Sequence, residues 1–563
     1  MPNSFYKAGT IREQSQLLPA RIEDYVDRNN AVRAIEAYVG SLDLAKLKFA
    51  HAARVAGAGQ PPYDPADLLK LYLYGYLNQV RSSRRLEREA GRNVELMWLL
   101  RGLTPGYRTI GQFRSDNVGP LKQANRDFVL VLRALDLVGG ELVAIDGAFF
   151  DGSASKASIV TRKRLDEQLA AVDREIAAVD CESAAVDQET AAVEREIEAY
   201  TAALDANDAA EAAEPEARPQ PNQDVAGKLA ALLAKRKAVA GYVARLEASG
   251  QTQLSRTDAD ARLLSKNGQS VAGYNVQIAV DAEHKLIVAC EAVNDGNDTG
   301  QLHAMAQAAC AAVGADKLQA VADTGYFNGE DLKACEDSGI EAYVPEPRRG
   351  TRLEEDGRFG ADAFDYDAEA NAYRCPAGEM LHAMAGGKLD QSGKLRIRYA
   401  SRRLVCSGCP KRQKCLSPKG TRRVIERWEH EDVIERHRRR MATGEAMMRH
   451  RKALAEHPFG TLKCRAGYRH FLMRGFDKVR GELGLMVLCY NFTRVLNIIG
   501  LEKLVAWFAA RSVLGAICLL AAVLAAAERL RGGCRLGGSG IMATVAGPLR
   551  HLRTVHSGAS FAT

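Results

Sequence analysis

Two short apolar runs that lie far apart in the chain end in the same way, and they constrain the fold more than any other feature. Residues 143–150 read Val-Ala-Ile-Asp-Gly-Ala-Phe-Phe, and residues 320–327 read Ala-Val-Ala-Asp-Thr-Gly-Tyr-Phe. An apolar run that stops at an aspartate close to a glycine is typical of a buried strand that ends at the rim of a sheet. We therefore expect Asp146 and Asp323 at the ends of two strands.

The sequence around these runs has the pattern of a mixed α/β domain. The first predicted strand covers residues 141–150. After a long insertion come two strands of a hairpin, a helix, a strand, a helix and a last strand, predicted at 271–281, 285–291, 301–313, 318–323, 329–338 and 340–344. This is the element order of a ribonuclease-H-like core. In such a core the first and fourth strands are neighbours, so the two aspartates would share one edge.

Paired carboxylates repel each other unless a proton or a cation lies between them. Mg²⁺ and Mn²⁺ prefer carboxylate oxygens, and two such ions can promote phosphoryl displacement. A third carboxylate is expected from Glu456, on a helix that Pro458 should stop or bend. Glu482 is its rival and Glu431 a weaker one. The alternative interpretation of Glu456 is a solvated helix residue paired with Lys452.

Charge is unevenly distributed, although the net charge is only +7. Residues 164–250 carry 9 Lys/Arg and 18 Asp/Glu, so the rest of the chain is strongly basic. Residues 421–480 carry 16 Lys/Arg and 8 Asp/Glu, and they include Arg436, Arg438, Arg439 and Arg440. Such an excess predicts a polyanionic partner. With a carboxylate metal site, it predicts an enzyme that acts on nucleic acid.

Residues 1–135 are predicted to be mostly helical. Ser82 or Ser83 and Thr109 are candidate helix caps, and basic residues lie near the helix starts. This pattern favours a helix-turn-helix-like DNA-binding domain, and the alternative is a small bundle with solvated arginines. Together with the basic segment near Glu456, the predicted DNA-binding side chains are Arg81, Arg84, Arg85, Arg108, Arg114, Lys463, Arg465, Arg469, Arg474 and Lys478.

A seven-residue repeat dominates the insertion at residues 164–250. Its apolar positions recur as in a coiled coil, three prolines between 215 and 221 break the helix, and the apolar pattern resumes from Val225 to Leu246. We expect an antiparallel helical hairpin. A dimerising coil is the competing interpretation, and the acidic faces argue against DNA contact there.

The chain has 12 cysteines and no recognisable secretory signal, which predicts a cytoplasmic protein with reduced thiols. Four of them have spacings that suit a structural Zn²⁺ site: Cys375, Cys406, Cys409 and Cys415. The alternative is a set of buried free thiols. The apolar stretch at 513–527 is short for a membrane span, so no membrane partner is expected.

Several strings, in order from residue 1 to about 500, resemble one family. They include Tyr-Gly-Tyr-Leu at 74–77, Thr-Ile-Gly-Gln-Phe-Arg at 109–114, Ile-Asp-Gly at 145–147, Gly-Tyr-Asn-Val-Gln at 273–277, Ala-Asp-Thr-Gly-Tyr-Phe at 322–327, Cys-Pro-Ala-Gly at 375–378 and Glu-His-Pro-Phe-Gly-Thr-Leu-Lys at 456–463. Together they resemble DDE transposases of bacterial insertion sequences, in the IS-eleven-eighty-two-like group with an InsH-like N-terminal domain.

The resemblance implies a catalytic triad of Asp146, Asp323 and Glu456, and it favours Glu456 over Glu482. It also implies Mg²⁺ or Mn²⁺ as cofactor, cleavage and strand transfer of double-stranded DNA at the element's inverted repeats and the target, and a homodimer or higher oligomer on DNA. The coiled-coil insertion and the tail after residue 503 are less typical of the family.

The expected organisation has seven segments: a helical DNA-binding domain at 1–135, a ribonuclease-H-like core at 136–163 and 251–348, the acidic hairpin at 164–250, a Cys-rich insert at 349–425, the helical end of the core at 426–503 and an atypical tail at 504–563. The expected function is that of a transposase. The alternatives are a nuclease without strand transfer and a catalytically inactive DNA-binding protein.

Overall fold

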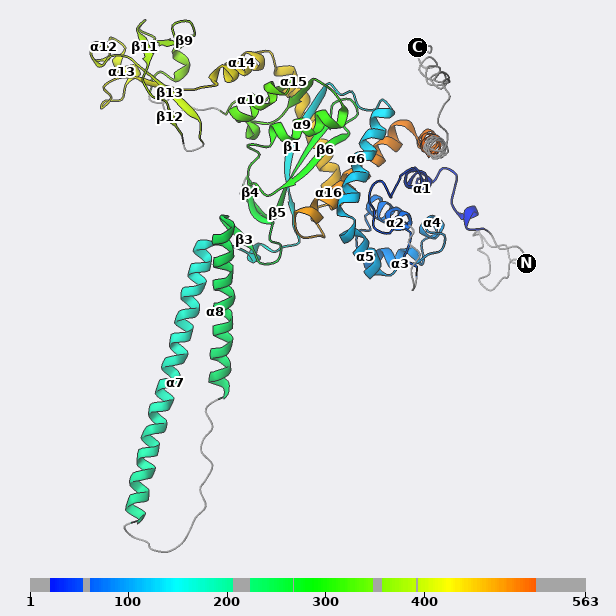
Figure 1. The fold of residues 1–563 in the computed structure, drawn as a ribbon, viewed down its shortest axis with the longest axis vertical. Helices are drawn as coiled ribbons and strands as arrows, with labels where there is room; N and C mark the ends of the chain where they lie inside the picture. The colour runs from blue at the N-terminus through cyan, green and yellow to red at the C-terminus, as the bar shows by residue number, and fades with distance from the viewer. Residues whose placement is uncertain are drawn as a thin grey trace, which may run out of the picture.

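The chain folds into an α/β body from which three other parts extend (Figure 1). The computed structural model describes residues 21–53, 61–205, 223–266, 268–347, 357–390 and 393–512. Short helices form the N-terminal part, a small β-rich lobe lies on the other side of the body, and a long helical hairpin projects away from the body.

A mixed six-stranded sheet forms the centre of the body. Its strands are β1 (Leu142–Asp151), β4 (Arg262–Lys266), β5 (Gln269–Asp281), β6 (Ile287–Val293), β7 (Leu318–Val321) and β8 (Ile340–Tyr343). β1 pairs antiparallel with β5 on one side and parallel with β7 on the other, and β8 continues the sheet beyond β7. β4 and β6 pair with the far edge of β5. The five predicted strands are confirmed to within two residues at each end, whereas β4 was not expected.

Helices cover both faces of this sheet. They are α9 (Leu302–Val313), α10 (Gly329–Asp337) and α15 (Glu445–Gly460). Val143 and Ile145 of β1 point toward the face that α9 and α10 cover. On the other face, Leu454 and Ala455 of α15 pack against Ala144. Because side chains alternate along a strand, Asp146 belongs to the face that α15 covers.

The N-terminal part is helical, as predicted. It contains a 3₁₀ turn (Ile22–Tyr25) and the helices α1 (Val32–Gly40), α2 (Pro65–Leu77), α3 (Ser83–Ala90), α4 (Val94–Leu99), α5 (Tyr107–Asp116) and α6 (Val118–Ala134). Ser82 is the residue before α3, but its side chain makes no capping hydrogen bond. The prediction that Thr109 caps a helix is wrong, because α5 begins two residues earlier, after Gly106.

One helix joins the N-terminal part to the body. α16 (Phe476–Ile499) packs against α2, α6 and β6, and its apolar residues belong to the largest core of the protein. Among the residues that the structure describes, α16 is the one helix long and apolar enough to cross a membrane, but most of its apolar window is buried inside the protein. It is therefore a core helix. The apolar stretch at 513–527 lies outside the described residues.

The insertion forms the antiparallel hairpin that the heptad pattern predicts, with α7 (Arg162–Asp205) and α8 (Gln223–Ser249) side by side (Figure 1). Leu165 of α7 is buried with Val239 and Leu246 of α8. The ion pair of Arg236 with Asp173 (2.6 Å) fixes the register between the helices. Short strands at the base, β2 (Ile159–Thr161) and β3 (Gln253–Ser255), close the hairpin. The proline-containing connection lies outside the described residues.

The β-rich lobe has its own sheet and a small aromatic core. Its elements are β9 (Asp365–Asp367), β10 (Ala372–Arg374), β11 (Met380–Ala383), β12 (Lys388–Leu389), β13 (Leu395–Ala400), β14 (Val424–Trp428), α12 (Arg403–Ser407) and α13 (Arg412–Cys415). Tyr373, Leu381, Tyr399 and Ile425 are buried together in its core. The chain leaves the lobe through β14 into α14 (Glu431–Ala442), which leads to α15.

Candidate functional site

Asp146 lies in the middle of β1 rather than at its end as predicted, because β1 continues to Asp151, whereas Asp323 follows the end of the neighbouring parallel strand β7 by two residues. The ladder between β1 and β7 pairs Leu142 with Gln319 and Ala144 with Val321. Continuing this register by two residues brings Asp146 level with Asp323, and residues at one level of a parallel pair point to the same face. The Asp323 carboxylate also contributes to the electrostatic environment of Asp146. The structure thus brings these two predicted residues together.

The Asp146 carboxyl is in an environment that disfavours its charge. The pKa of Asp146 is raised to about 6: burial is the largest cause and the Asp323 charge adds to it, while the Gly147 N–H and the charges of Arg451 and Lys266 oppose the rise. A buried carboxylate beside a second carboxylate is stabilised when a cation binds to both. The pair therefore has the electrostatic character of a cation site.

The glycine after Asp146 is needed because a polar cluster approaches it closely. A Cβ on Gly147 would lie no more than 3.0 Å from side-chain atoms of Gln277, Asp298 and Tyr326. The backbone N–H of Gly147 donates to Asp146 Oδ1 (3.0 Å), and the N–H of Gly325 donates to Asp323 Oδ1 (2.9 Å). Each aspartate is thereby oriented by a backbone amide one or two residues further along the chain.

The cluster behind Gly147 was not found from the sequence. The side-chain amides of Asn275 and Gln277 both donate to Asp298 Oδ1 at 2.8 Å, and the Tyr326 hydroxyl donates to Gln277. Lys266 Nζ lies 3.4 Å from Asp298 Oδ2. These contacts tie β5 to the segments that precede α9 and follow β7, and they lie against Gly147 in the middle of β1. The signal that could have found them is the string Gly-Tyr-Asn-Val-Gln, which carries the two amides.

Glu456 lies on the helix that covers the aspartate face, but its side chain is exposed. The neighbours Leu454 and Ala455 face the sheet. Within the described ranges, no group of three or more His, Cys, Asp or Glu side chains is close enough to hold a metal ion. Glu456 therefore lies on the helix that covers the Asp146 face of the sheet, but its carboxylate does not join those of Asp146 and Asp323. Pro458 does not end the helix as expected: α15 continues to Gly460, and a π-helical turn follows at Thr461–Arg465.

Glu482, the rival carboxylate, has a structural role. It is fully buried and accepts hydrogen bonds from the Tyr76 hydroxyl (2.9 Å) and from the backbone N–H groups of Leu472 (2.9 Å) and Met473 (3.0 Å). It connects the N-terminal helices to α16. No contact joins it to the aspartate pair.

Two arginines predicted to bind DNA turn inward to this carboxylate. The guanidinium of Arg81 lies 3.8 Å from Glu482 and donates to the His470 carbonyl, and that of Arg114 lies 4.0 Å from Glu482. Both side chains are mostly buried. The prediction that Arg81 and Arg114 contact phosphates is therefore wrong for this structure, because a buried carboxylate holds them inside the protein.

Lys463 also points into the protein. Its ammonium donates to the carbonyl of Phe149 (2.7 Å) and lies 4.6 Å from the centre of the Phe150 ring, and burial lowers its pKa. This brings its positive charge to β1, close to Asp146, rather than to the surface. Arg474 donates to the Ser153 carbonyl (3.1 Å) but stays exposed. The other predicted DNA-binding side chains are exposed: Arg84, Arg85, Arg108, Arg465, Arg469 and Lys478.

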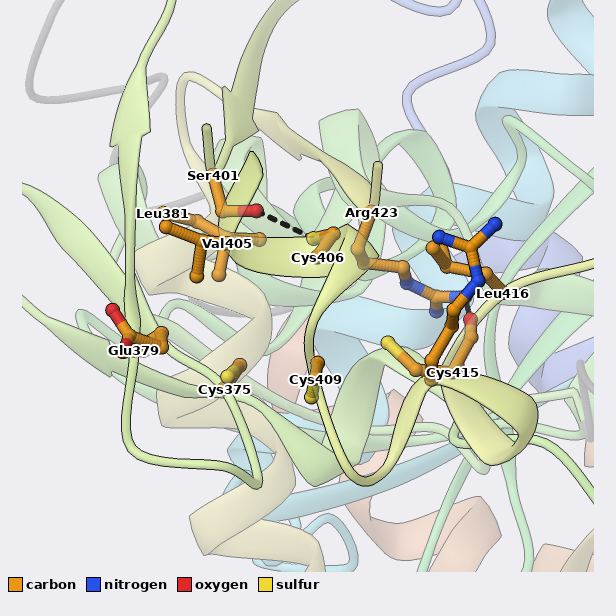
Figure 2. Close-up of a pocket in the computed structure, with 11 residues that line it drawn as sticks. Cys375, Glu379, Leu381, Ser401, Val405, Cys406, Cys409, Cys415, Leu416 and Arg423 are labelled. Carbon is orange, nitrogen blue, oxygen red and sulfur yellow. Dashed lines mark hydrogen bonds between the residues drawn. The ribbon is translucent and has the colours of Figure 1, made fainter. Parts of the chain in front are cut away.

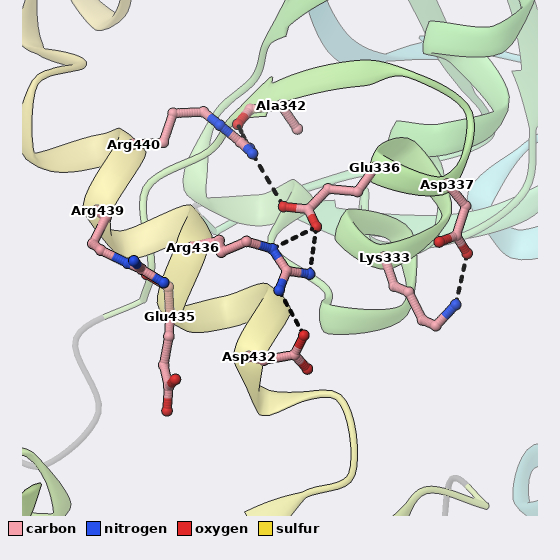
Figure 3. Close-up of polar contacts among 9 residues, drawn as sticks. All are labelled: Lys333, Glu336, Asp337, Ala342, Asp432, Glu435, Arg436, Arg439 and Arg440. Atoms are coloured by element: carbon pink, nitrogen blue, oxygen red, sulfur yellow. Dashed lines mark hydrogen bonds and ion pairs between the residues drawn. The ribbon is translucent and has the colours of Figure 1, made fainter. Parts of the chain in front are cut away.

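The arginines of α14 are used to attach this helix to the body (Figure 3). Arg436 bridges Glu336 (2.8 Å) and Asp432 (2.6 Å), and Arg440 binds Glu336 (3.0 Å) and the Ala342 carbonyl (3.1 Å). These contacts fix α14 on α10 and β8. These acidic partners offset the charges of Arg436 and Arg440.

The four cysteines of the lobe line one small cavity, as the spacing suggested (Figure 2). The cavity has a volume of about 30 Å³, close to the volume of one water molecule. Burial raises the pKa of the Cys415 thiol, Arg423 opposes this, and the thiols of Cys406, Cys375 and Cys409 raise it further. The sulfur atoms are not arranged at ligand distances: the Cys406 thiol instead lies 2.7 Å from the Ser401 hydroxyl.

Two family models match the chain. The model described as Transposase domain (DUF772) matches residues 20–116, and the model described as Transposase DDE domain matches residues 248–492. Together they cover more than half of the chain. The second match includes Asp323 and Glu456, whereas Asp146 precedes it, before the α7–α8 hairpin. No curated protein and no solved structure matches the chain.

Proposed function

Since the chain is a DDE transposase of an insertion sequence, we propose that Asp146, Asp323 and Glu456 are the carboxylates that hold its catalytic metal ions. Members of this family generally use a divalent metal such as Mg²⁺, and they cleave and transfer DNA strands. The family therefore does not favour the two alternatives, a nuclease without strand transfer and an inactive DNA-binding protein. The proposal depends most on one observation: the register of β1 and β7 pairs Ala144 with Val321, two residues before each aspartate.

The donor set suits Mg²⁺ or Mn²⁺. Two carboxylates on one face give hard oxygen ligands, and the raised pKa of Asp146 means that a bound cation would stabilise its charged form. Bound there, the ions would supply Lewis-acid activation and a template for in-line phosphoryl transfer. Within the chain, Asp146 and Asp323 bind, the backbone N–H groups of Gly147 and Gly325 orient them, and Lys463 places a positive charge near Asp146.

Glu456 completes this set in our proposal by a movement of α15. The helix packs on the sheet through Leu454 and Ala455 and, near its end, through Phe459 against Phe150, and the π-helical turn that follows is a place where it can rotate. A rotation that turns the exposed Glu456 toward the sheet would add the third carboxylate. DNA binding is the event that we expect to stabilise the rotated helix, because the negative phosphates favour a fully occupied metal site.

We also propose that the body is a ribonuclease-H-like core. The strand order β6–β5–β1–β7–β8 supports this, with antiparallel pairing among the first three and parallel pairing among the last three. In that arrangement the long hairpin is an insertion between the first and second core strands. The remaining exposed cations are proposed to contact phosphates of the inverted repeats and target DNA: Arg84, Arg85, Arg108, Arg465, Arg469, Arg474 and Lys478.

The test uses DNA that carries the ends of the element. Asp146→Asn, Asp323→Asn and Glu456→Gln should each abolish Mg²⁺-dependent cleavage and the joining of pre-cut ends, while binding of the ends in the absence of divalent metal stays within about twofold of wild type. Glu482→Gln is the matched control for the rival glutamate. This variant should unfold at a lower urea concentration than wild type, but the molecules that remain folded should still cleave DNA. Cleavage by the Asp146→Asn variant would overturn the proposal.

The Cys-lined cavity is proposed to hold a structural Zn²⁺ ion. The four cysteines line one shared cavity, and four thiolates are a common closed zinc set, so binding would require the thiols to change their χ1 angles. Metal analysis of the purified protein should find about one zinc per chain. Cys409→Ser should remove it, whereas Cys464→Ser, at an exposed cysteine outside the lobe, should not. Equal zinc content in both variants would contradict the site.

The element-level proposals come from the resemblance. We propose that the element belongs to the IS-eleven-eighty-two-like group and that the protein acts in the cytoplasm as a homodimer or higher oligomer on DNA. Terminal inverted repeats that bracket the gene would support the assignment. Light scattering of the complex with end DNA would measure the number of subunits, and a single chain per DNA end pair would contradict the oligomer.

A further inference from the structure

One segment of the lobe contains many basic residues and no acidic ones, although Lys394 and Arg396 pair with Glu330 and Asp390 outside it. Residues 394–423 contain 11 Lys/Arg and no Asp/Glu. In α14, by contrast, Arg436 and Arg440 both form ion pairs with acidic side chains. Cationic side chains without acidic partners nearby repel one another. A cluster of such side chains on a folded domain indicates a surface that binds a polyanion.

Some of these cations are used inside the lobe. Arg423 donates to the carbonyls of Cys415 and Phe359, and Arg412 donates to the carbonyl of Gly420. These bonds build the loops around the cysteines. The exposed cations are a different set, which we call the basic tip: Arg402, Arg403, Lys411, Lys414 and Lys419.

No side chain of the basic tip forms an ion pair within the described part of the chain. One of them, Lys411, donates to the Pro376 carbonyl. The basic tip is carried by α12, α13 and the loops beside them, at the outer end of the lobe (Figure 1). Five charged heads at the outer end of a lobe are accessible to a large ligand.

An apolar side chain stands among these charges. Leu404 follows Arg402 and Arg403 on α12 and is 87% exposed. Full exposure of a leucine forgoes roughly 1.5–3 kcal/mol relative to burial. Apolar side chains beside arginines are a common feature of proteins that press into a DNA groove, where the apolar group contacts sugars or bases while the cations bind phosphates. This combination favours DNA over a small anion.

The cysteine cavity explains how such a tip can be rigid. α12 and α13 have five and four residues, too few to be stable alone. Cys406, Cys409 and Cys415 lie within four residues of a cation of the basic tip. A Zn²⁺ ion in the cavity would therefore fix the backbone that carries the tip.

We propose that the basic tip is a DNA-contacting surface of this transposase, with its cations on backbone phosphates and Leu404 in the adjoining groove. The inference rests on the chain's action on DNA but not on the identity of the catalytic carboxylates. Because binding is measured without Mg²⁺, failure of the catalytic proposal leaves this one standing, and the reverse also holds.

The experiment measures the affinity of the full-length protein for a duplex with the element's end and for an unrelated duplex, by fluorescence anisotropy between 50 and 200 mM salt. The four-residue variant Arg402→Gln, Arg403→Gln, Lys411→Gln and Lys414→Gln should lower the slope of log K against log salt by about 3 to 4, close to 0.9 for each phosphate that the protein no longer neutralises. The weakening should be similar for both duplexes, because phosphate contacts carry no sequence information.

Two further variants keep the outcome decisive. The pair Lys411→Gln and Lys414→Gln leaves α12 intact and should lower the slope by about 2. The matched control is Lys163→Gln, Arg164→Gln, Lys237→Gln and Arg245→Gln, four exposed cations on the acidic hairpin, which should leave the slope within about 1 of wild type. Leu404→Ser should weaken binding severalfold without changing the slope. A thermal unfolding profile equal to that of wild type shows that the lobe is folded. A wild-type slope in both tip variants would overturn the proposal.

Discussion

Replacing Asp146 by asparagine should stabilise the metal-free protein, even though it removes a catalytic group. The folded-state pKa of about 6 exceeds the ordinary value of 3.8, so the folded protein binds this proton more tightly than the unfolded chain. The stability that the protonated carboxyl contributes is complete below pH 3.8 and is lost as the pH rises through 6. Above that pH, the charged Asp146 costs about 3 kcal/mol, from about 2 pKa units at roughly 1.36 kcal/mol each.

Asparagine has the same shape and no charge, so Asp146→Asn should recover much of this cost at pH 8. At pH 5 the gain should fall to about half, because the folded wild-type carboxyl is then mostly protonated. The assay is scanning calorimetry without divalent metal, in which the transition that Mg²⁺ shifts in wild type identifies the body. A gain near about 3 kcal/mol corresponds to several degrees in the melting temperature of a domain of this size.

The control is Asp151→Asn, at the exposed end of the same strand. It should leave the melting temperature within about 1 °C at both pH values. Added Mg²⁺ should raise the melting temperature of wild type and of Asp151→Asn, but much less that of Asp146→Asn. If Asp146→Asn is no more stable than wild type at pH 8, the Asp146 carboxyl is not in a buried environment that disfavours its charge.

Three other substitutions test the packing around the site. Glu482→Ala should lower the free energy of unfolding, measured in urea, by about 3–5 kcal/mol, because two buried arginines lose their counter-charge. Glu456→Ala, at an exposed position, should lower it by under about 1 kcal/mol, and equal losses would contradict the structural role of Glu482. Gly147→Ala should reduce cleavage strongly and cost about 1–3 kcal/mol, since its methyl group would displace the amide of Gln277; wild-type activity would show that the cluster yields easily. Leu246→Asp should reduce far-UV helicity by opening the hairpin near its base, while end cleavage persists; unchanged helicity would contradict the seam.

The sequence was sufficient for five of the six strands of the central sheet, because each is a short apolar run bounded by turn residues, whereas the polar strand β4 was missed. It was also sufficient for the hairpin, whose heptads repeat over many turns. The lobe was missed because its strands are two to six residues long and mostly half-buried, so they lack a clear period.

The contacts around the candidate site could not be predicted from the sequence, because they join residues that are far apart in the chain. Asp146 and Asp323 were picked out by the apolar runs before them, although β1 continues five residues past Asp146, whereas Asp298 is buried by partners more than 20 residues away and has no pattern of its own. Arg81 and Arg114 carry the same charge as any surface arginine. Their partner Glu482 lies hundreds of residues further along the chain, and only the tertiary fold brings them together.

The hairpin between β1 and β5 has a consequence for how this protein is made. When a ribosome finishes β1, neither neighbour of that strand exists yet, and β5 emerges more than a hundred residues later. Helices with local contacts form quickly, so α7 and α8 can fold and pack against each other while synthesis continues. When the hairpin has formed, the end of β1 and the start of the chain that leads to β5 lie side by side. β1 and β5 can then pair almost as quickly as two strands joined by a short turn.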